Sequence, residues 1–138
     1  MNFLDYKIWV SKRIFTKKLR DLLFKAEKKT YKNKKLQINL ALNYGSKSEI
    51  INTIRLLKKN NKKINEKNIS NNLYTKGIPD PEILIRTGNT HRLSNFLLWQ
   101  IAYSEIFFEK KLWPDFNVSD FKKILNRFKI IKRNYGSI

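Results

Sequence analysis

The sequence predicts an α/β fold in which a partial parallel β-sheet is flanked by helices. Short apolar segments suited to strands alternate with amphipathic segments suited to helices. Glycines at 45 and 88 punctuate the chain where two of the strand segments end. An alternation of strand and helix is typical of parallel strands joined by crossover helices.

The first half of the sequence predicts two strands and two helices. The apolar segment 7–10 is a short strand candidate, and 36–45 is a second one. Spacing of i, i+3, i+4, i+7 predicts a helix over 16–30 whose apolar face carries Leu19, Leu22, Leu23 and Ala26. Ser46 and Glu49 have the spacing of a capping box, which predicts that a second helix begins there. Its apolar side chains are Ile50, Ile51, Ile54 and Leu57.

The second half begins with a polar connection over 58–77, which includes a Lys/Asn-rich tract expected to be a surface loop and one short helix. Prolines 79 and 81 then precede a strand at 82–86. The remaining elements are expected to be a buried helix at 95–104, a short strand at 105–108 and a helix at 118–132.

Composition indicates one folded domain that works in a reducing compartment. The chain has 138 residues, of which 41% are hydrophobic, so it can bury a modest core. The net charge of +19 favours nucleic-acid binding at first sight, but 23 of the 30 cations are Lys and 7 are Arg, which also fits a biased composition. No cysteine is present, and no apolar run approaches the ~20 residues of a membrane span. We therefore expect a soluble, cytoplasmic protein without a nucleic-acid partner.

Arginines and a serine gather where the strand at 82–86 ends. Arg86 closes that strand, Gly88 permits a sharp turn, and the loop can return Arg92 and Ser94 beside Arg86. Two guanidinium groups and a hydroxyl form an anion site, for which a diphosphate is a better match than a single carboxylate. The alternative is that both arginines are ordinary solvent-facing charges. Parallel strands open toward ligands at their carboxyl ends, so Arg86 and Gly45 are expected to face one crevice.

Two further side chains near this cluster have competing interpretations. His91, the single histidine, is expected to pack or cap rather than to catalyse. Glu105 lies within an apolar aromatic run, where an acid is paired, bound to a metal or exposed at an edge. A hard cation such as Mg²⁺ prefers carboxylate oxygens and substrate phosphates, so Glu105 close to the arginines would suit it.

The segment "PDPEILIRTGNTHRLSNFLLWQIAYSEIFFEKKLWPDF" (79–116) closely resembles the signature block of cis-prenyltransferases, the undecaprenyl diphosphate synthase family. A second block, "INLALNYGSKSEI" (38–50), is similar to another of its motifs, and the resemblance spans about 7–136. It implies a Mg²⁺-dependent condensation of isopentenyl diphosphate with an allylic diphosphate such as farnesyl diphosphate. Arg86, Arg92 and Ser94 match the isopentenyl diphosphate site, and Glu105 matches the acid that holds Mg²⁺ across the interface of a homodimer.

The chain also departs from the family pattern. Asn89 and Thr90 stand where Gly-Glu is usual, and Ser46-Lys47 replaces Gly-Arg after Gly45. Asn134 lies where an arginine is usual. The aspartate loop that binds the allylic diphosphate has no match within 1–138. We therefore expect a single truncated domain, the C-terminal portion of the fold, that binds a diphosphate but does not elongate prenyl chains alone.

Three functions remain open from the residues and the resemblance together. The first is a prenyltransferase present as a fragment, acting on isopentenyl and allylic diphosphates with Mg²⁺ and touching the membrane through its lipid product. The second is a non-catalytic partner that completes the site of a chain carrying the N-terminal half. The third is a basic nucleic-acid-binding module.

Overall fold

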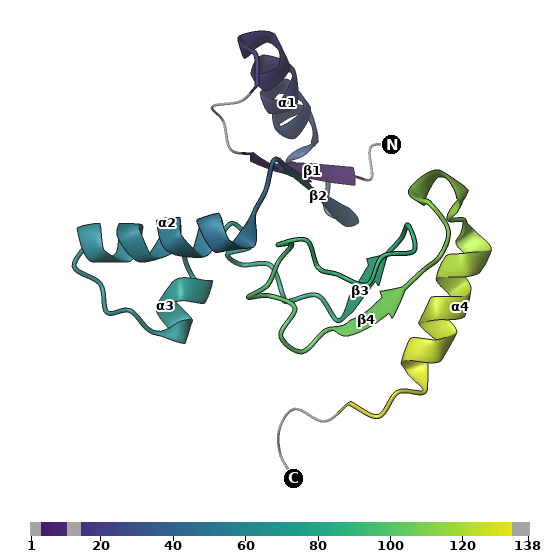
Figure 1. The fold of residues 1–138 in the computed structure, drawn as a ribbon. Helices are drawn as coiled ribbons and strands as arrows, with labels where there is room; N and C mark the ends of the chain where they lie inside the picture. The colour runs from purple at the N-terminus through teal and green to yellow at the C-terminus, as the bar shows by residue number, and fades with distance from the viewer. Residues whose placement is uncertain (1–3, 11–14, 134–138) are drawn as a thin grey trace. The chain divides into compact units, whose positions relative to one another are not determined.

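Two compact units make up the chain, Met1–Gly45 and Ser46–Ile138. The computed structural model describes residues 4–10 and 15–133 of them (Figure 1). Within the described parts, strands of each unit pair in parallel and helices flank them, so the prediction of an α/β fold with parallel strands is confirmed. The strands form two 2-stranded ladders in the described residues. One domain over 1–138 remains a prediction.

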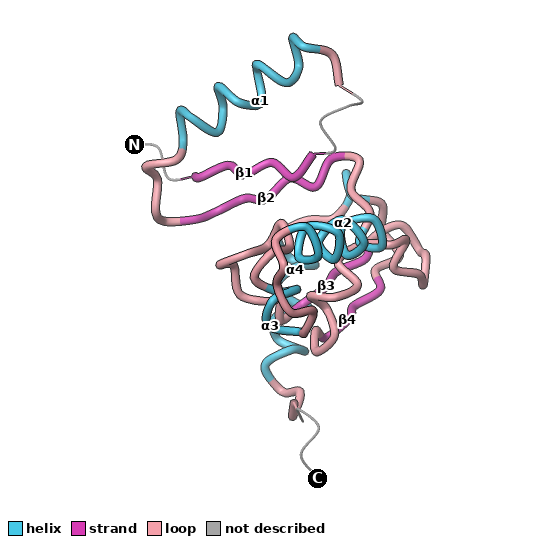
Figure 2. The backbone as a smooth tube through the Cα atoms, turned by 90° about the vertical axis from the view of Figure 1, so that its left-hand side faces the viewer, coloured by secondary structure: helices cyan, strands magenta, loops and turns pink. Residues whose placement is uncertain are grey.

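The first unit is a β-α-β arrangement. Strand β1 (Leu4–Val10) pairs with β2 (Leu36–Leu42) over their whole lengths, from Leu4↔Leu36 to Val10↔Leu42. Helix α1 (Lys17–Thr30) connects them and contacts β1, and Figure 2 shows it running beside the two strands. The hydroxyl of Thr16 accepts a hydrogen bond from the Leu19 N–H at 3.4 Å and caps the helix.

Both strands of this unit have bounds that differ from the prediction. Strand β1 begins at Leu4 rather than at 7, because all seven of its residues have partners in the parallel strand β2. Strand β2 ends at Leu42 rather than at 45, because Asn43 has a left-handed backbone with φ 49°. The apolar pattern of the sequence indicates neither the extent of the pairing with β2 nor the left-handed backbone at Asn43.

Helices α2 (Ser46–Lys59) and α3 (Glu66–Ser70) enclose the hydrophobic core of the second unit. Leu57 is fully buried, and Ile69 and Leu73 pack with it; Ile50 and Trp99 cover the cluster. The indole N–H of Trp99 donates to the Ser70 hydroxyl at 3.0 Å, which satisfies the polar edge of this large side chain. The helix predicted to begin at Ser46 is confirmed as α2.

The predicted capping box of α2 is not formed. Ser46 and Glu49 are both buried, and their side chains accept hydrogen bonds from distant segments instead. Ser46 Oγ accepts from the Leu98 N–H at 3.0 Å, and Glu49 Oε1 accepts from the Tyr74 N–H at 2.6 Å. The spacing was misleading because a tertiary donor competes for the same side-chain oxygens that a local cap would use.

The second ladder joins β3 (Ile83–Arg86) to β4 (Glu105–Phe108), with Ile83 opposite Glu105 and Arg86 opposite Phe108. Pairing continues past the strands, since the Gly88 N–H donates to the Lys111 carbonyl at 2.7 Å. After the short 3₁₀ helix η1 (Trp113–Asp115), helix α4 (Val118–Lys129) closes the described part of the chain. Helix α4 ends three residues before the predicted bound of 132.

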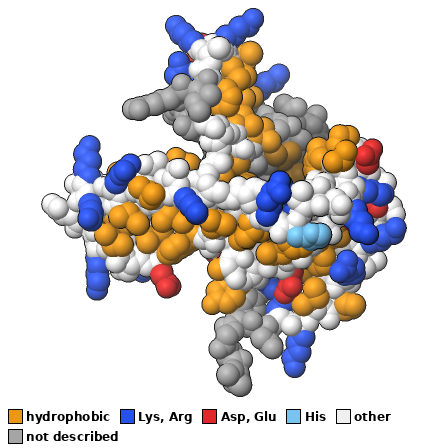
Figure 3. Space-filling view, in the orientation of Figure 1, with side chains coloured by type: hydrophobic (Ala, Val, Ile, Leu, Met, Phe, Trp, Pro, Cys, Tyr) orange, Lys and Arg blue, Asp and Glu red, His pale blue; other side chains and the backbone are white. Residues whose placement is uncertain are grey.

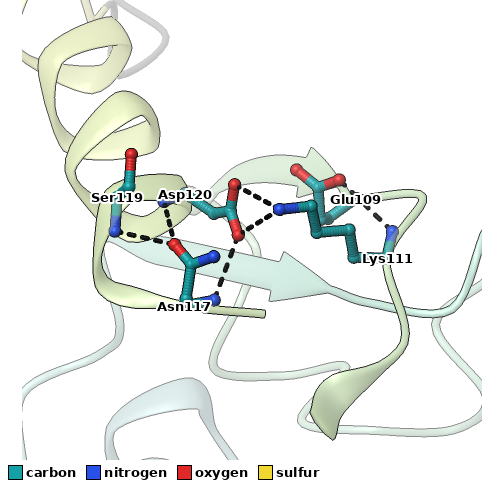
Figure 4. Close-up of polar contacts among 5 residues, drawn as sticks. All are labelled: Glu109, Lys111, Asn117, Ser119 and Asp120. Atoms are coloured by element: carbon teal, nitrogen blue, oxygen red, sulfur yellow. Dashed lines mark hydrogen bonds and ion pairs between the residues drawn. The ribbon is translucent and has the colours of Figure 1, made fainter. Parts of the chain in front are cut away.

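An ion pair fastens α4 to the segment that follows β4 (Figure 4). Lys111 Nζ lies 2.8 Å from Asp120 Oδ2, and Asp120 also belongs to a capping box with Asn117. The hydrogen bond from Lys111 lowers the pKa of the Asp120 carboxyl below its ordinary value and raises the pKa of the Lys111 ammonium. Lys111 thus connects the turn at Gly88, through its carbonyl, to the first turn of α4, through its side chain.

The predicted buried helix at 95–104 is wrong. This segment is a succession of turns, with positive φ at Ser94 (49°), Asn95 (61°) and Leu97 (46°). Left-handed residues interrupt a right-handed helix, although the burial predicted for the segment holds for Leu97, Gln100 and Ile101.

Several apolar side chains lie at the surface. Figure 3 shows hydrophobic atoms exposed along α2. Ile51 and Leu56 are exposed large hydrophobic residues of this helix. Among the described residues, no helix combines the length and apolarity that crossing a bilayer requires.

Candidate functional site

Arg86 ends strand β3 with its guanidinium group held from one side. Its Nε–H donates to the hydroxyl of Thr90 at 2.9 Å, while its backbone carbonyl accepts from the Glu109 N–H at 2.7 Å. Within the described residues, no other hydrogen bond or ion pair of this side chain is present. The Thr90 contact fixes the plane of the guanidinium and leaves its two Nη groups available to an oxyanion.

The turn after β3 depends on Gly88, as the sequence predicts. Gly88 has φ 90°, and Asn89 follows with φ 52°. A Cβ on Gly88 would meet the side chain of Leu112 at 3.9 Å, which is ordinary contact, so the backbone conformation and not the space requires glycine. Hydrogen bonds from the N–H groups of Gly88 and Asn89 then fix the turn on the segment after β4.

A pocket of ≈ 420 Å³ brings Arg86 and Arg92 together. Its other lining residues are apolar or small: Leu84, Ile85, Thr87, Leu93 and Phe96. Arg92 is exposed, and no described residue bonds to its guanidinium. The structure places the two arginines in one pocket, which combines two cations with an apolar wall, while the predicted anion site itself stays a prediction.

Ser94 lies next to this pocket in sequence without lining it. The residue is exposed, and its φ of 49° is left-handed. The structure thus joins two of the three predicted anion ligands in one pocket and places the third on the segment that leaves it.

Asn95 is a site residue that local sequence reasoning missed. Its carbonyl accepts from the Ser46 N–H, and its side-chain Oδ1 accepts from the Lys47 N–H, both at 2.9 Å. These are the first two N–H groups of α2, so Asn95 caps a helix that begins 49 residues earlier in the chain, at Ser46. Asn is a favoured capping residue, but the sequence around 95 holds no sign of which helix it caps.

A buried polar network lies behind the same turns. Gln100 Nε2 donates to the Thr75 hydroxyl at 3.1 Å and to Glu49 Oε2 at 3.4 Å. Gln100 and Glu49 are both 2% exposed. The network connects α2, the segment after α3 and the turns at 97–100.

His91 packs instead of bonding to a catalytic partner. Its ring meets that of Phe108 edge to face, with centroids 4.8 Å apart and an angle of 62° between the planes. The prediction of a packing role is confirmed by this contact.

Glu105 does not line the arginine pocket within one chain, and its role as a metal ligand stays a prediction. It pairs with Ile83, three residues before Arg86 on β3, which corresponds to about 10 Å along the strand. The carboxylate is half-buried and has no partner among the described residues. Those residues contain no group of three or more acidic or histidine side chains that could hold a metal.

The other sequence predictions for the site are not decided. Gly45 belongs to the first unit and Arg86 to the second, so their shared crevice remains a prediction. Lys47 is exposed at the start of α2, and Asn134 lies outside the described residues.

Comparisons with known proteins agree on a family. The family model described as "Putative undecaprenyl diphosphate synthase" matches residues 4–136. An isoprenyl transferase of Oceanobacillus iheyensis is 41% identical over 129 residues, which cover 88% of this chain and 51% of the relative. The chain therefore spans about half the length of this curated relative.

Solved structures show the same fold. A probable undecaprenyl diphosphate synthase from Campylobacter jejuni superposes with a TM-score of 0.89 at 33% identity, covering 99% of this chain and 64% of that one. Lavandulyl diphosphate synthase from Lavandula x intermedia, in complex with dimethylallyl diphosphate, gives 0.90 at 29% identity, covering 97% of this chain and 61% of that one. This chain belongs to the undecaprenyl diphosphate synthase family of prenyltransferases.

Proposed function

We propose that the pocket between Arg86 and Arg92 binds isopentenyl diphosphate for a cis-prenyltransferase reaction. One observation supports this most directly: two guanidinium groups share a pocket with apolar side chains, and among the described residues Arg86 is bound only through its Nε–H to Thr90 while Arg92 has no bonding partner. Isopentenyl diphosphate has the matching construction, a doubly phosphorylated head on a five-carbon apolar body. A pocket built for a free inorganic anion would have no use for the apolar wall.

Different residues of the pocket contact the diphosphate and the isopentenyl group. Arg86 and Arg92 hold the diphosphate through charge-assisted hydrogen bonds, for which the guanidinium fork is well shaped. Ser94 donates its hydroxyl from the adjoining turn. Leu93 and Phe96 contact the isopentenyl group and exclude water from it. In the family reaction a carbon–carbon bond forms between the isopentenyl group and the allylic chain as the diphosphate of the allylic partner leaves, and the isopentenyl group loses a proton to the released diphosphate or to solvent.

The proposal includes Mg²⁺, with Glu105 as one of its ligands. The carboxylate of the half-buried Glu105, which bonds to no other residue that the structure describes, is a chemically suitable ligand for a hard cation. Because Arg86 lies about 10 Å away along the strand pair, and the described residues offer no further cluster of acids, the remaining ligands come from substrate and from another chain. A homodimer or a complementary subunit supplies that chain. When bound, Mg²⁺ neutralises diphosphate charge.

Titration of the intact chain with three compounds tests the pocket. Isopentenyl diphosphate contains both the head and the apolar body, inorganic diphosphate lacks the body, and isopentenol lacks the head. We expect the affinity to fall in that order. Isopentenol binding as tightly as isopentenyl diphosphate would contradict the arginine clamp, and equal affinity for inorganic diphosphate would contradict the role of the apolar wall.

A further inference from the structure

We propose that Asn95 is a positioning residue for the diphosphate pocket, acting by fastening the Arg92–Ser94 segment to the first turn of α2. The inference rests on the proposed function of that pocket. Arg92 and Ser94 sit on an exposed loop, and a long side chain on a loop binds an anion well only if the loop itself is held. Asn95 is the residue that provides a described hydrogen-bonded attachment immediately after them.

The attachment consists of three hydrogen bonds in a stretch of four residues. Asn95 accepts from the Ser46 N–H with its carbonyl and from the Lys47 N–H with its side chain, both at 2.9 Å. In return the Leu98 N–H donates to Ser46 Oγ at 3.0 Å. Ser46 is fully buried, so its N–H and hydroxyl would be costly to leave unpaired. The segment 95–98 and the first turn of α2 therefore satisfy each other's polar groups.

The backbone of the same stretch is in a conformation that needs such support. Ser94, Asn95 and Leu97 all have positive φ, which is unfavourable for residues with a Cβ and most unusual for a bulky one such as leucine. Asn tolerates this region better than most residues. The burial of Leu97 and the three hydrogen bonds compensate for the strain, and together they define the direction in which Arg92 and Ser94 leave the turn.

The side chain and the backbone of Asn95 can be separated by mutation. Asn95→Ala removes the bond to Lys47 and disfavours positive φ. Asn95→Gly removes the same bond while keeping the left-handed backbone accessible. Asn117→Ala is the matched control, because Asn117 caps α4 with the same chemistry and does not line the pocket.

The experiment measures two quantities on the wild-type chain and these variants: affinity for isopentenyl diphosphate, and amide hydrogen exchange at residues 46–47 and 92–98. For Asn95→Ala we expect about tenfold weaker binding, equivalent to one lost hydrogen bond to a charged group, and faster exchange in both segments. Asn95→Gly should lie between it and the wild type. Asn117→Ala should keep wild-type affinity and show faster exchange only at the start of α4.

Two results would overturn the inference. One is an Asn95→Ala variant that binds within twofold of the wild type or no worse than Asn117→Ala. The other is unchanged exchange at 92–98 in both Asn95 variants. If the wild-type chain itself does not bind isopentenyl diphosphate, the proposed function fails, while exchange at 92–98 still decides whether Asn95 holds the loop.

Discussion

Replacement of Arg86 by lysine is the sharpest perturbation of the proposed clamp. Lysine keeps the positive charge but loses the planar fork. The Nε–H of Arg86 is bound to Thr90, so its Nη groups are the ones available to the proposed diphosphate, and a single ammonium cannot reproduce both functions. One lost hydrogen bond to a charged group costs about 1.5–3 kcal/mol, which corresponds to roughly 10- to 100-fold weaker binding.

Thr90→Val is the matched control for this variant. It removes the acceptor that orients the guanidinium but leaves the fork intact. The lost bond orients the guanidinium without touching the diphosphate, so we expect a smaller loss than for Arg86→Lys, about 0.5–1.5 kcal/mol, or roughly two- to tenfold weaker binding.

Isothermal titration with isopentenyl diphosphate measures both variants, and thermal unfolding followed by circular dichroism checks that they remain folded. The reasoning is refuted if Arg86→Lys binds like the wild type while folded, or if Thr90→Val weakens binding more than Arg86→Lys does.

Three further predictions concern the proposed metal ligand Glu105, the stability in acid and the hydrophobic core. Glu105→Gln should leave metal-free binding of isopentenyl diphosphate within twofold of the wild type, because Glu105 pairs with Ile83 at the far end of the strands from Arg86; a larger loss in the same titration would contradict that placement. The lowered pKa of Asp120 means that its ion pair contributes stability above about pH 4 and loses it as the pH falls further. Urea unfolding from pH 3 to 7 should therefore show a smaller acid loss for Asp120→Asn, and an unchanged pH profile would count against the pair. Leu57→Ala should destabilise the second unit by about 2–5 kcal/mol in urea, because the side chain is fully buried; a loss below about 1 kcal/mol would show that the core can collapse around the gap.

Local features of the sequence were sufficient for the arginine pocket. Arg86 ends a strand, Gly88 allows the turn, and the short loop then has few ways to return other than toward its own strand. These signals lie within nine residues, so an argument from pattern alone reaches the site. The helical periodicity of α1, α2 and α4 is local in the same sense, and all three were predicted within a few residues.

The features that the sequence patterns did not reveal all depend on contacts between segments that are far apart in the chain. The turns at 95–104 are held by the start of α2, and no propensity near 95 reveals a donor 48 residues away. Ser46 and Glu49 matched a capping box, but the N–H groups of Leu98 and Tyr74 take their oxygens. Because β3 and β4 are parallel, Glu105 lies opposite the beginning of β3. The apolar pattern of 105–108 does not indicate this register.

Arginine side-chain NMR tests the central claim most directly, because it locates the bound diphosphate. The chain has seven arginines, each with one Nε–H, and their signals are assigned by single substitutions in ¹⁵N-labelled protein. Titration with isopentenyl diphosphate should shift the Nε–H signals of Arg86 and Arg92 together, with a common dissociation constant, and leave Arg127 and Arg133 unchanged. Shifts confined to other arginines, or spread evenly over all of them as for a nonspecific cation surface, would contradict the account.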